Sequence, residues 1–158
     1  LRRPFGHVVN MVPSLHDRIE SILRETGKDK LILIAHSMGG LVSRQYLQAH
    51  GDGRVGQLIT LGSPHRGTRL AKIALFPCVF DMRRRSGFLD DLAALEAAHP
   101  PKVPTTSIYT LNDDLVYPPE TSELPWAENI AVQAVGHVSL LFDKGVFQRI
   151  AALISPGS

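Results

Sequence analysis

The sequence predicts an α/β fold, a doubly wound and mostly parallel sheet with flanking helices, formed by a single domain of 158 residues. Two observations indicate this fold. Short apolar or β-branched runs alternate with segments of helical periodicity, which is the order that β-α-β crossovers produce. The run at 31–34 is apolar at every position, as expected for a strand covered on both faces of a parallel sheet.

Residues 14–26 are predicted to form the first helix. Ser14 is its candidate N-cap, and Gly27, which adopts left-handed conformations easily, ends it. The apolar residues of this segment recur at helical spacing along one face: Leu15, Ile19, Ile22 and Leu23.

A strand, a helix and a second strand follow. The apolar strand at 31–34 leads through a tight turn into a predicted helix at 41–49, which ends near Gly51. The next strand is predicted at 55–61, where it is ended by the Gly-Ser-Pro sequence at 62–64.

Two more strands and a closing helix complete the predicted order. The strand at 105–111 is rich in hydroxyl and β-branched residues, and another strand is expected at 130–135. Apolar residues four positions apart predict a helix at 146–154. The segment at 69–104 is too long for a simple crossover, so we expect it to form a cap or lid insertion over the carboxyl edge of the sheet.

The composition argues against several classes of function. The net charge of +2, from 17 basic and 15 acidic residues, is too small to indicate nucleic-acid binding, and the arginines at 83–85 are interpreted as a solvated loop. The single cysteine, Cys78, excludes an internal disulfide and a multi-cysteine metal site. No metal-ligand, phosphate-loop or dinucleotide motif occurs, so no metal or cofactor is predicted.

The pentapeptide at 35–39, Ala-His-Ser-Met-Gly, joins the apolar strand to the following helix. A strand, a tight turn with a central serine and a helix are typical of a nucleophile elbow, where small flanking residues allow the two backbones to approach. Such a turn would lift the Ser37 hydroxyl above the sheet edge. The backbone N–H of Met38, at the helix N-terminus, would then face an oxyanion formed on the substrate.

An acid and a base follow the last two predicted strands. A serine hydroxyl needs a histidine to take its proton, and that histidine needs a carboxylate to hold its tautomer. Asp113 and Asp114 come directly after the third strand, and His137 follows the fourth. Because the carboxyl ends of parallel strands meet at one edge of a sheet, these side chains are expected to lie close to Ser37.

Asp113 is favoured over Asp114 as the acid. The residues that follow, Leu115 and Val116, then supply an apolar turn that directs the Asp113 side chain inward, and Asp114 stays as the alternative. The predicted catalytic residues are Ser37, Asp113 and His137, with the Met38 N–H as oxyanion donor. His36 is interpreted as a structural residue that points away from Ser37, and His65 as a packing or turn residue beside the site.

With these motifs in register, the sequence resembles the α/β-hydrolase superfamily, and in particular its lipase and esterase branch. Members of that branch often carry Ala-His-Ser-Met-Gly-Gly, found here at 35–40, and Gly-Thr/Ser-Pro-His-x-Gly-Thr, found here at 62–68. The acid turn Asp-x-x-Val matches 113–116, and the histidine loop Gly-His-x-x-Leu matches 136–140. The resemblance implies hydrolysis of carboxylic esters of fatty acids through an acyl-enzyme on Ser37.

The resemblance has one departure. In the family several strands precede the nucleophile strand, and a loop among them supplies the second oxyanion N–H. Only 30 residues precede Leu31, and the one His-Gly pair, at 50–51, lies after the elbow helix. We therefore expect the chain to be the carboxyl-terminal portion of a longer hydrolase, in which the strand at 31–34 is an edge that other strands would cover.

The main hypothesis is a serine hydrolase of small-molecule or lipid esters, and the apolar residues of the predicted cap favour lipid-like substrates. No apolar run approaches the roughly 18 residues of a membrane span, so membrane contact is expected to be transient and at the surface. Two alternatives stay open: a lipid acyltransferase with the same catalytic residues, and a catalytically silent truncated hydrolase that acts as an interaction module.

Overall fold

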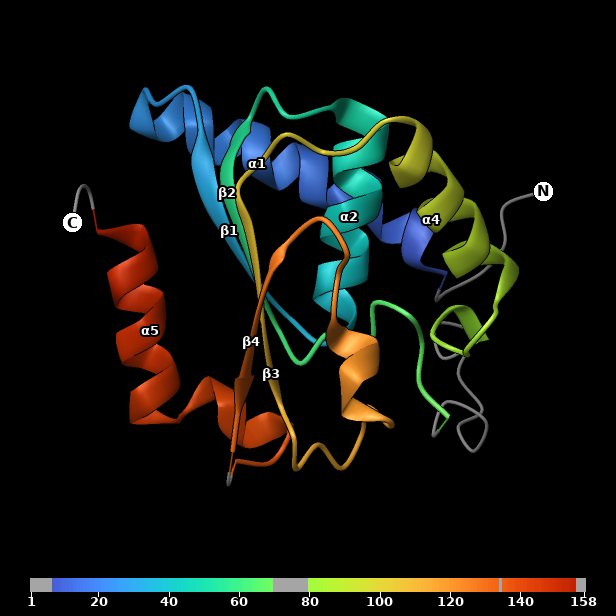
Figure 1. Cartoon of the computed structure of the whole chain (residues 1–158). Coiled ribbons are helices and arrows are strands. Elements are labelled where there is room, and N and C mark those ends of the chain that lie inside the picture. The colour runs from blue at the N-terminus through green and yellow to red at the C-terminus, as the bar shows by residue number, and fades with distance from the viewer. Residues whose placement is uncertain (1–6, 70–79, 134, 156–158) are drawn as a thin grey trace.

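The computed structural model describes residues 7–69, 80–133 and 135–155. Cys78 and most of the apolar residues of the predicted cap fall at 70–79, outside the described residues. Four parallel strands form one sheet in the order β1-β2-β3-β4, and in Figure 1 they run side by side through the centre of the molecule. Their bounds are Leu31–His36 for β1, Val55–Leu61 for β2, Thr105–Thr110 for β3 and Glu128–Val132 for β4.

Helices cover both faces of this sheet. In Figure 1, α1, α2 and α4 lie on one side of the strands and α5 lies on the other. The α-helices are α1 (Val12–Thr26), α2 (Met38–His50), α4 (Gly87–Ala98) and α5 (Lys144–Ile154), with 3₁₀ turns η1 (Val8–Met11), η3 (Pro119–Ser122) and η4 (Val138–Leu141). The predicted parallel α/β sheet with flanking helices is confirmed. No helix of the described residues has the length and apolar character needed to cross a bilayer.

The two faces of β2 belong to two different apolar cores. Leu58 packs with Ile19 of α1 and Leu41 of α2 in the first core. Its neighbour Ile59 points to the opposite face and packs with Val146 of α5 in the second core. Because both faces are buried, β2 is apolar at successive positions, as the sequence pattern requires for a strand between two layers of helices.

The strand β1 is an edge of the described sheet, paired only with β2. Ile32 and Ile34 are 43% and 49% exposed, although their residue types are those of a strand covered on both faces. The apolar pattern of β1 predicts a strand inside the sheet, but in the described sheet β1 lies at the edge. This agrees with the second expectation, that the strand at 31–34 forms an exposed apolar edge. Exposed apolar edges of this kind are pairing sites for further strands.

Each of the three predicted helices starts two or three residues earlier than its sequence pattern indicates, at Val12, Met38 and Lys144. The first helix begins at Val12 rather than at Ser14, and its N-cap residue, Met11, makes no side-chain cap; Pro13 in the first turn needs no hydrogen-bond partner for its nitrogen. Ser14 is therefore not the N-cap. The predicted end is confirmed, because Gly27 caps the helix at a φ of 65°.

Helix α4 lies in the segment predicted to form a cap and was not itself predicted. Ser86 is its N-cap, and its hydroxyl accepts a hydrogen bond from the Leu89 N–H at 3.2 Å. Leu89 belongs to the first core, which fastens this part of the segment to the body of the fold. The local signal was a serine followed by a run of Leu, Ala and Glu, all strong helix formers. A lid function for 69–104 stays a prediction.

Candidate active site

Ser37 occupies a strained turn between β1 and α2. Its φ and ψ are 53° and −126°, a backbone conformation that residues with a side chain rarely adopt. The Ser37 N–H donates to the Leu61 carbonyl at the end of β2 over 2.9 Å, and the Gly40 N–H donates to the Ser37 carbonyl over 3.1 Å. The Ser37 side chain does not cap the helix that it precedes. The two backbone hydrogen bonds therefore stabilise the turn, and the hydroxyl of Ser37 is not needed to cap the helix.

The close approach of the elbow helix to the sheet falls at Gly40. A Cβ on Gly40 would lie 2.2 Å from the Ser63 Oγ and 2.7 Å from its Cβ, whereas a Cβ on Gly39 would lie 3.6 Å from the Cβ of Ala35. The first separation is a clash and the second is an ordinary contact. The small residue at position 40 is therefore required by the loop after β2, and the pair Ala35 and Gly39 tolerates a methyl group.

We expect Gly40→Ala to lower the free energy of unfolding by roughly 2 kcal/mol or more, because the new methyl overpacks a rigid contact. Gly39→Ala is the matched control. It lies one residue earlier in the same helix and should be neutral or stabilising by up to about 1 kcal/mol. Urea unfolding of both variants tests the prediction, and adding Ser63→Gly to Gly40→Ala should restore part of the loss. Equal stabilities of the two alanine variants would contradict it.

Asp113 and His137 form a buried pair at the ends of β3 and β4. The His137 Nδ1 lies 2.9 Å from Oδ2 and 3.0 Å from Oδ1 of Asp113, and His137 is 2% exposed. The carboxylate accepts further hydrogen bonds through Oδ1, from the N–H groups of Leu115 at 2.9 Å and Val116 at 2.7 Å. The turn after the acid thus orients Asp113 through its backbone donors.

Asp114 has a different place in the same loop. Its Oδ1 accepts a hydrogen bond from the backbone N–H of His137 at 3.1 Å, so it fixes the histidine loop without touching the imidazole. The two acids that the sequence left in competition therefore bind different atoms of one residue. Only Asp113 contacts a ring nitrogen, which is the contact that an orienting acid requires.

Gly62, directly after β2, makes room for the imidazole. Its φ is 53°, and a Cβ at this position would lie 3.1 Å from the His137 Nδ1 and 2.9 Å from a methyl of Leu140. Glycine is the residue that combines this backbone conformation with so close an approach. The ends of four neighbouring strands thus contribute Ser37, Gly62, Asp113 and His137 to one edge of the sheet.

His36, interpreted from the sequence as a structural residue that points away from Ser37, lies against His137, a contact that the sequence did not indicate. Its Nε2 is 3.2 Å from the His137 carbonyl oxygen, and the two ring centroids are 4.7 Å apart. Because a carbonyl oxygen only accepts, Nε2 must carry the hydrogen. Burial lowers the pKa of His36, which favours the neutral ring. The residue before the serine therefore helps to hold the histidine loop.

His65 is buried behind the elbow helix, as its packing interpretation predicted. It is 2% exposed, its Nε2 lies 3.0 Å from the Thr60 Oγ1, and its Nδ1 has no hydrogen-bond partner among the described residues. Burial, followed by the positive charges of Arg44 and Arg66, holds the pKa of His65 well below its usual value. The ring is therefore neutral in the folded protein.

The neutral state of His65 predicts an acid-sensitive stability. Below a pH of about 6.5 the unfolded chain protonates this residue while the folded chain does not, so the free energy of unfolding falls as pH falls. We expect His65→Gln to reduce the slope of the free energy of unfolding against pH by on the order of 1 kcal/mol per pH unit, while the contribution of His36, whose pKa is also lowered, remains. Unfolding measured between pH 7.5 and 5 tests this, with the exposed His99→Gln as control. An unchanged slope in His65→Gln would refute it.

Met38 is the first residue of α2, so its N–H has no partner inside the helix. This is the position required of an oxyanion donor, and the role stays a prediction. Within the part of the chain that the structure describes, no group of three His, Cys, Asp or Glu side chains could hold a metal ion.

Comparison with known proteins gives three findings. The family model of the PGAP1-like alpha/beta domain matches residues 6–124. Two proteins described as triacylglycerol lipases, from Pseudarthrobacter phenanthrenivorans and Burkholderia plantarii, are each 43% identical over 53 residues, which is 34% of this chain. The match spans 16% and 14% of the length of these two relatives.

The third finding is structural. The mature form of the Bacillus licheniformis lipase BlEst2 superposes with a TM-score of 0.83 at 19% sequence identity, over 97% of this chain and 76% of that one. This similarity confirms the α/β-hydrolase fold that the sequence predicts.

Proposed function

The chain belongs to the PGAP1-like alpha/beta domain family, and we propose that it hydrolyses carboxylic esters through an acyl-enzyme formed on Ser37. One observation carries the proposal. The carboxylate of Asp113 binds the Nδ1 of a buried His137, at the same sheet edge where a strained elbow presents Ser37. A buried acid and imidazole beside a serine elbow are the parts that acyl transfer requires.

The proposed mechanism assigns one step to each residue. Asp113 accepts a hydrogen bond from Nδ1, so the neutral imidazole keeps its proton there and leaves Nε2 as the base. His137 takes the proton of Ser37 as its Oγ attacks the ester carbonyl, and the Met38 N–H stabilises the oxyanion. His137 then protonates the leaving alcohol. Water, deprotonated by the same histidine, releases the acid and regenerates Ser37.

We propose lipid-like esters as the substrates. The matched proteins from two bacteria are described as triacylglycerol lipases, and the superposed Bacillus licheniformis protein is described as a lipase. The family resemblance of the sequence implies the same class of substrate. An acyltransferase would share every residue of the first half-reaction and differ only in the acceptor, so the competition between water and alcohol distinguishes the two activities.

The test uses the chain in its full-length context. We expect hydrolysis of p-nitrophenyl esters and a stoichiometric mass increase on the peptide that contains Ser37 after treatment with a fluorophosphonate. Adding an alcohol shows whether the acyl group passes mainly to water, as expected, or to the alcohol, as an acyltransferase would require. A folded protein that takes no label at Ser37 would contradict the proposal and support the silent interaction module.

A further inference from the structure

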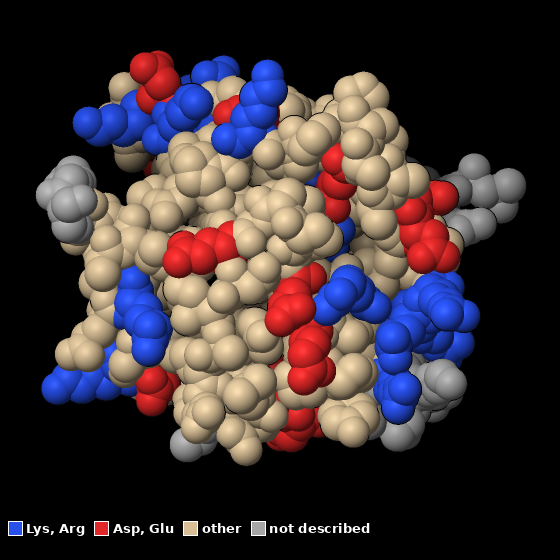
Figure 2. Space-filling view, viewed as in Figure 1, with Lys and Arg blue, Asp and Glu red and all other residues tan. Residues whose placement is uncertain are grey.

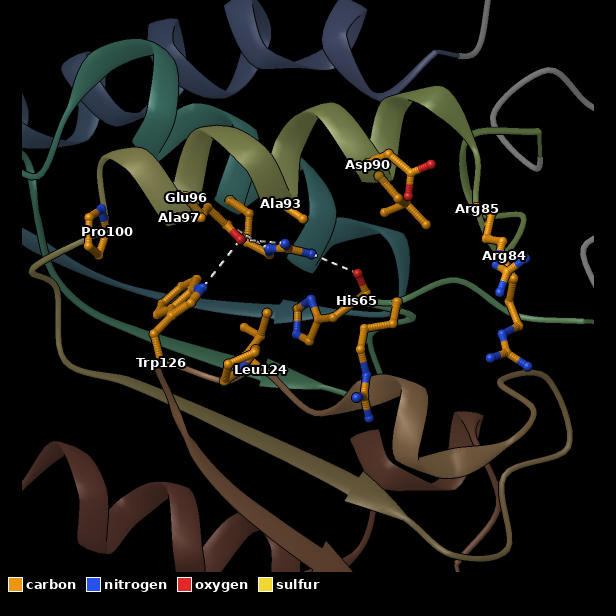
Figure 3. A pocket seen from close by; sticks show the side chains of 14 residues that line it. His65, Arg84, Arg85, Asp90, Ala93, Glu96, Ala97, Pro100, Leu124 and Trp126 are labelled. Atoms are coloured by element: carbon orange, nitrogen blue, oxygen red, sulfur yellow. Dashed lines mark hydrogen bonds and ion pairs between the residues drawn. The ribbon is translucent and has the colours of Figure 1, made fainter.

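The structure contains a pocket of about 560 Å³ that none of the proposed catalytic residues lines. Figure 3 shows it between helix α4 and the segment that carries Leu124 and Trp126. Its size lies within the range of small-molecule sites, roughly 300 to 1,000 Å³. The pocket is therefore large enough for a ligand of its own.

The floor of the pocket is a buried ion pair. Arg44 of α2 binds Glu96 of α4 through two hydrogen bonds, 2.8 Å from Nε to Oε1 and 2.6 Å from a terminal nitrogen to Oε2. The remaining partners are a carbonyl and an indole: Arg44 donates to the His65 oxygen at 2.9 Å, and Trp126 Nε1 donates to Glu96 Oε2 at 3.2 Å. The charges of Arg44 and Glu96 therefore neutralise each other, and the hydrogen bond to Glu96 fixes the indole ring of Trp126 at the side of the pocket.

One end of the pocket is apolar. In Figure 3, Trp126 and Pro100 lie at this end, with Ala97 and Leu124 beside them. Along α4 the wall runs from Leu89 to Ala97, about 12 Å at 1.5 Å per residue. This length and the small side chains of the helix leave a slot suited to an extended aliphatic chain of medium length.

The other end is basic. Arg84 and Arg85 lie there, apart from Trp126 in Figure 3, and basic side chains gather near the beginning of α4 in Figure 2. Both arginines are exposed, and neither forms an ion pair with another described residue. Arg66 also lines the pocket but is bound by Glu123 at 3.2 Å. Of the two adjacent acids at this end of α4, Asp90 and Asp91, Asp90 lines the pocket.

Arg85 has a positive φ of 59°, which is unusual for a residue with a side chain. Independently of that backbone angle, both side chains are exposed and neither guanidinium has a hydrogen-bond or ion-pair partner among the described residues, so their N–H donors are available to a ligand at the basic end of the pocket. Arginine binds carboxylates through paired N–H donors. The basic end is therefore complementary to a single carboxylate at the end of an apolar chain.

From this arrangement we propose that the pocket binds an aliphatic monocarboxylate of medium chain length, with its tail beside Trp126 and its carboxylate at Arg84 and Arg85. The inference goes beyond the proposed ester hydrolysis and does not depend on it, because Ser37, Asp113 and His137 do not line the pocket. Binding should therefore persist in Ser37→Ala.

Trp126 is the single tryptophan of these 158 residues and lines the pocket, so the part of the fluorescence change that Trp126→Phe removes reports on the pocket. We expect decanoate, added to the Ser37→Ala protein in its full-length context, to change this fluorescence saturably and to raise the Tm. Decanol, which lacks the charge, and acetate, which lacks the tail, should bind at least tenfold more weakly. Equal affinity for decanol, or no saturable response to decanoate, would overturn the proposal.

Two pairs of variants locate the site. Arg84→Gln with Arg85→Gln should raise the Kd for decanoate tenfold or more, whereas Arg18→Gln with Arg24→Gln, which removes equal charge from exposed positions of α1, should leave it unchanged. Ala97→Leu should fill the tail slot, and Ala94→Leu on the same helix, outside the pocket lining, is its control. If the two double arginine variants lost affinity for decanoate to the same extent, the attraction would depend on net charge alone, and the proposed site would be refuted.

Discussion

Replacing Ser37 by alanine should abolish ester hydrolysis, with kcat/KM reduced by about 10⁴- to 10⁶-fold. The reason is that the acyl-enzyme needs an oxygen nucleophile at the elbow, whereas the fold does not use this hydroxyl to cap α2. The Tm should therefore change little. Initial rates with a p-nitrophenyl ester, measured together with thermal unfolding, separate loss of the nucleophile from loss of the fold.

Ser37→Gly gives an independent control on the same position. Glycine also removes the nucleophile, so activity should be equally low, but it relieves the backbone strain of a φ of 53°. We expect this variant to be more stable than Ser37→Ala by roughly 1 kcal/mol. Activity retained in either variant would place the nucleophile elsewhere, and equal stability would argue against strain in the elbow.

Replacing Asp113 by asparagine should lower kcat by about 10⁴-fold with a small change in KM. The amide presents a donor or a neutral oxygen to His137 Nδ1 in place of the carboxylate, so the imidazole loses its preferred tautomer and the stabilisation of its protonated form. Two backbone N–H groups, from Leu115 and Val116, hold the side chain in place and should keep the geometry of the turn. Steady-state kinetics with a p-nitrophenyl ester measure the effect.

Asp114→Asn is the matched control, one residue away and with the same change of charge. Its side-chain oxygen can still accept the hydrogen bond of the His137 N–H, so we expect kcat to fall tenfold or less. The ratio between the two variants, rather than either value alone, identifies the acid. Similar and small losses in both would contradict the assignment of Asp113.

Much of the fold was readable from local patterns. The second strand is found at 55–61, the same range that its apolar run and the following Gly-Ser-Pro predict, and Gly27 ends the first helix through its backbone freedom. The elbow was also readable, because a serine between an apolar strand and a helix is a local signal. These features depend on residues close in sequence, where periodicity and turn chemistry act directly.

The errors arose where local signals compete. Ser14 is a good capping residue, yet the helix starts earlier because Pro13 is favourable in a first turn. Helix α4 has a serine cap and strong helix formers, but it lies within a segment whose length indicated a cap over the sheet edge. The apolar pattern of β1 predicts a strand that is covered on both faces, whereas β1 is an edge of the described sheet. The residues of a strand do not specify which strands lie beside it.

The sequence by itself determined the order of the four strands and of every α-helix except α4, together with the residue types at the strand ends, because these follow from short-range periodicity and turn formation. The tertiary structure alone decided which acid touches the His137 ring, that His36 contacts the same histidine, and that Trp126 and Arg84 line one pocket. The physical reason is that such contacts join residues far apart in the chain. Their geometry is set by how the packed sheet and helices bring separate loops together.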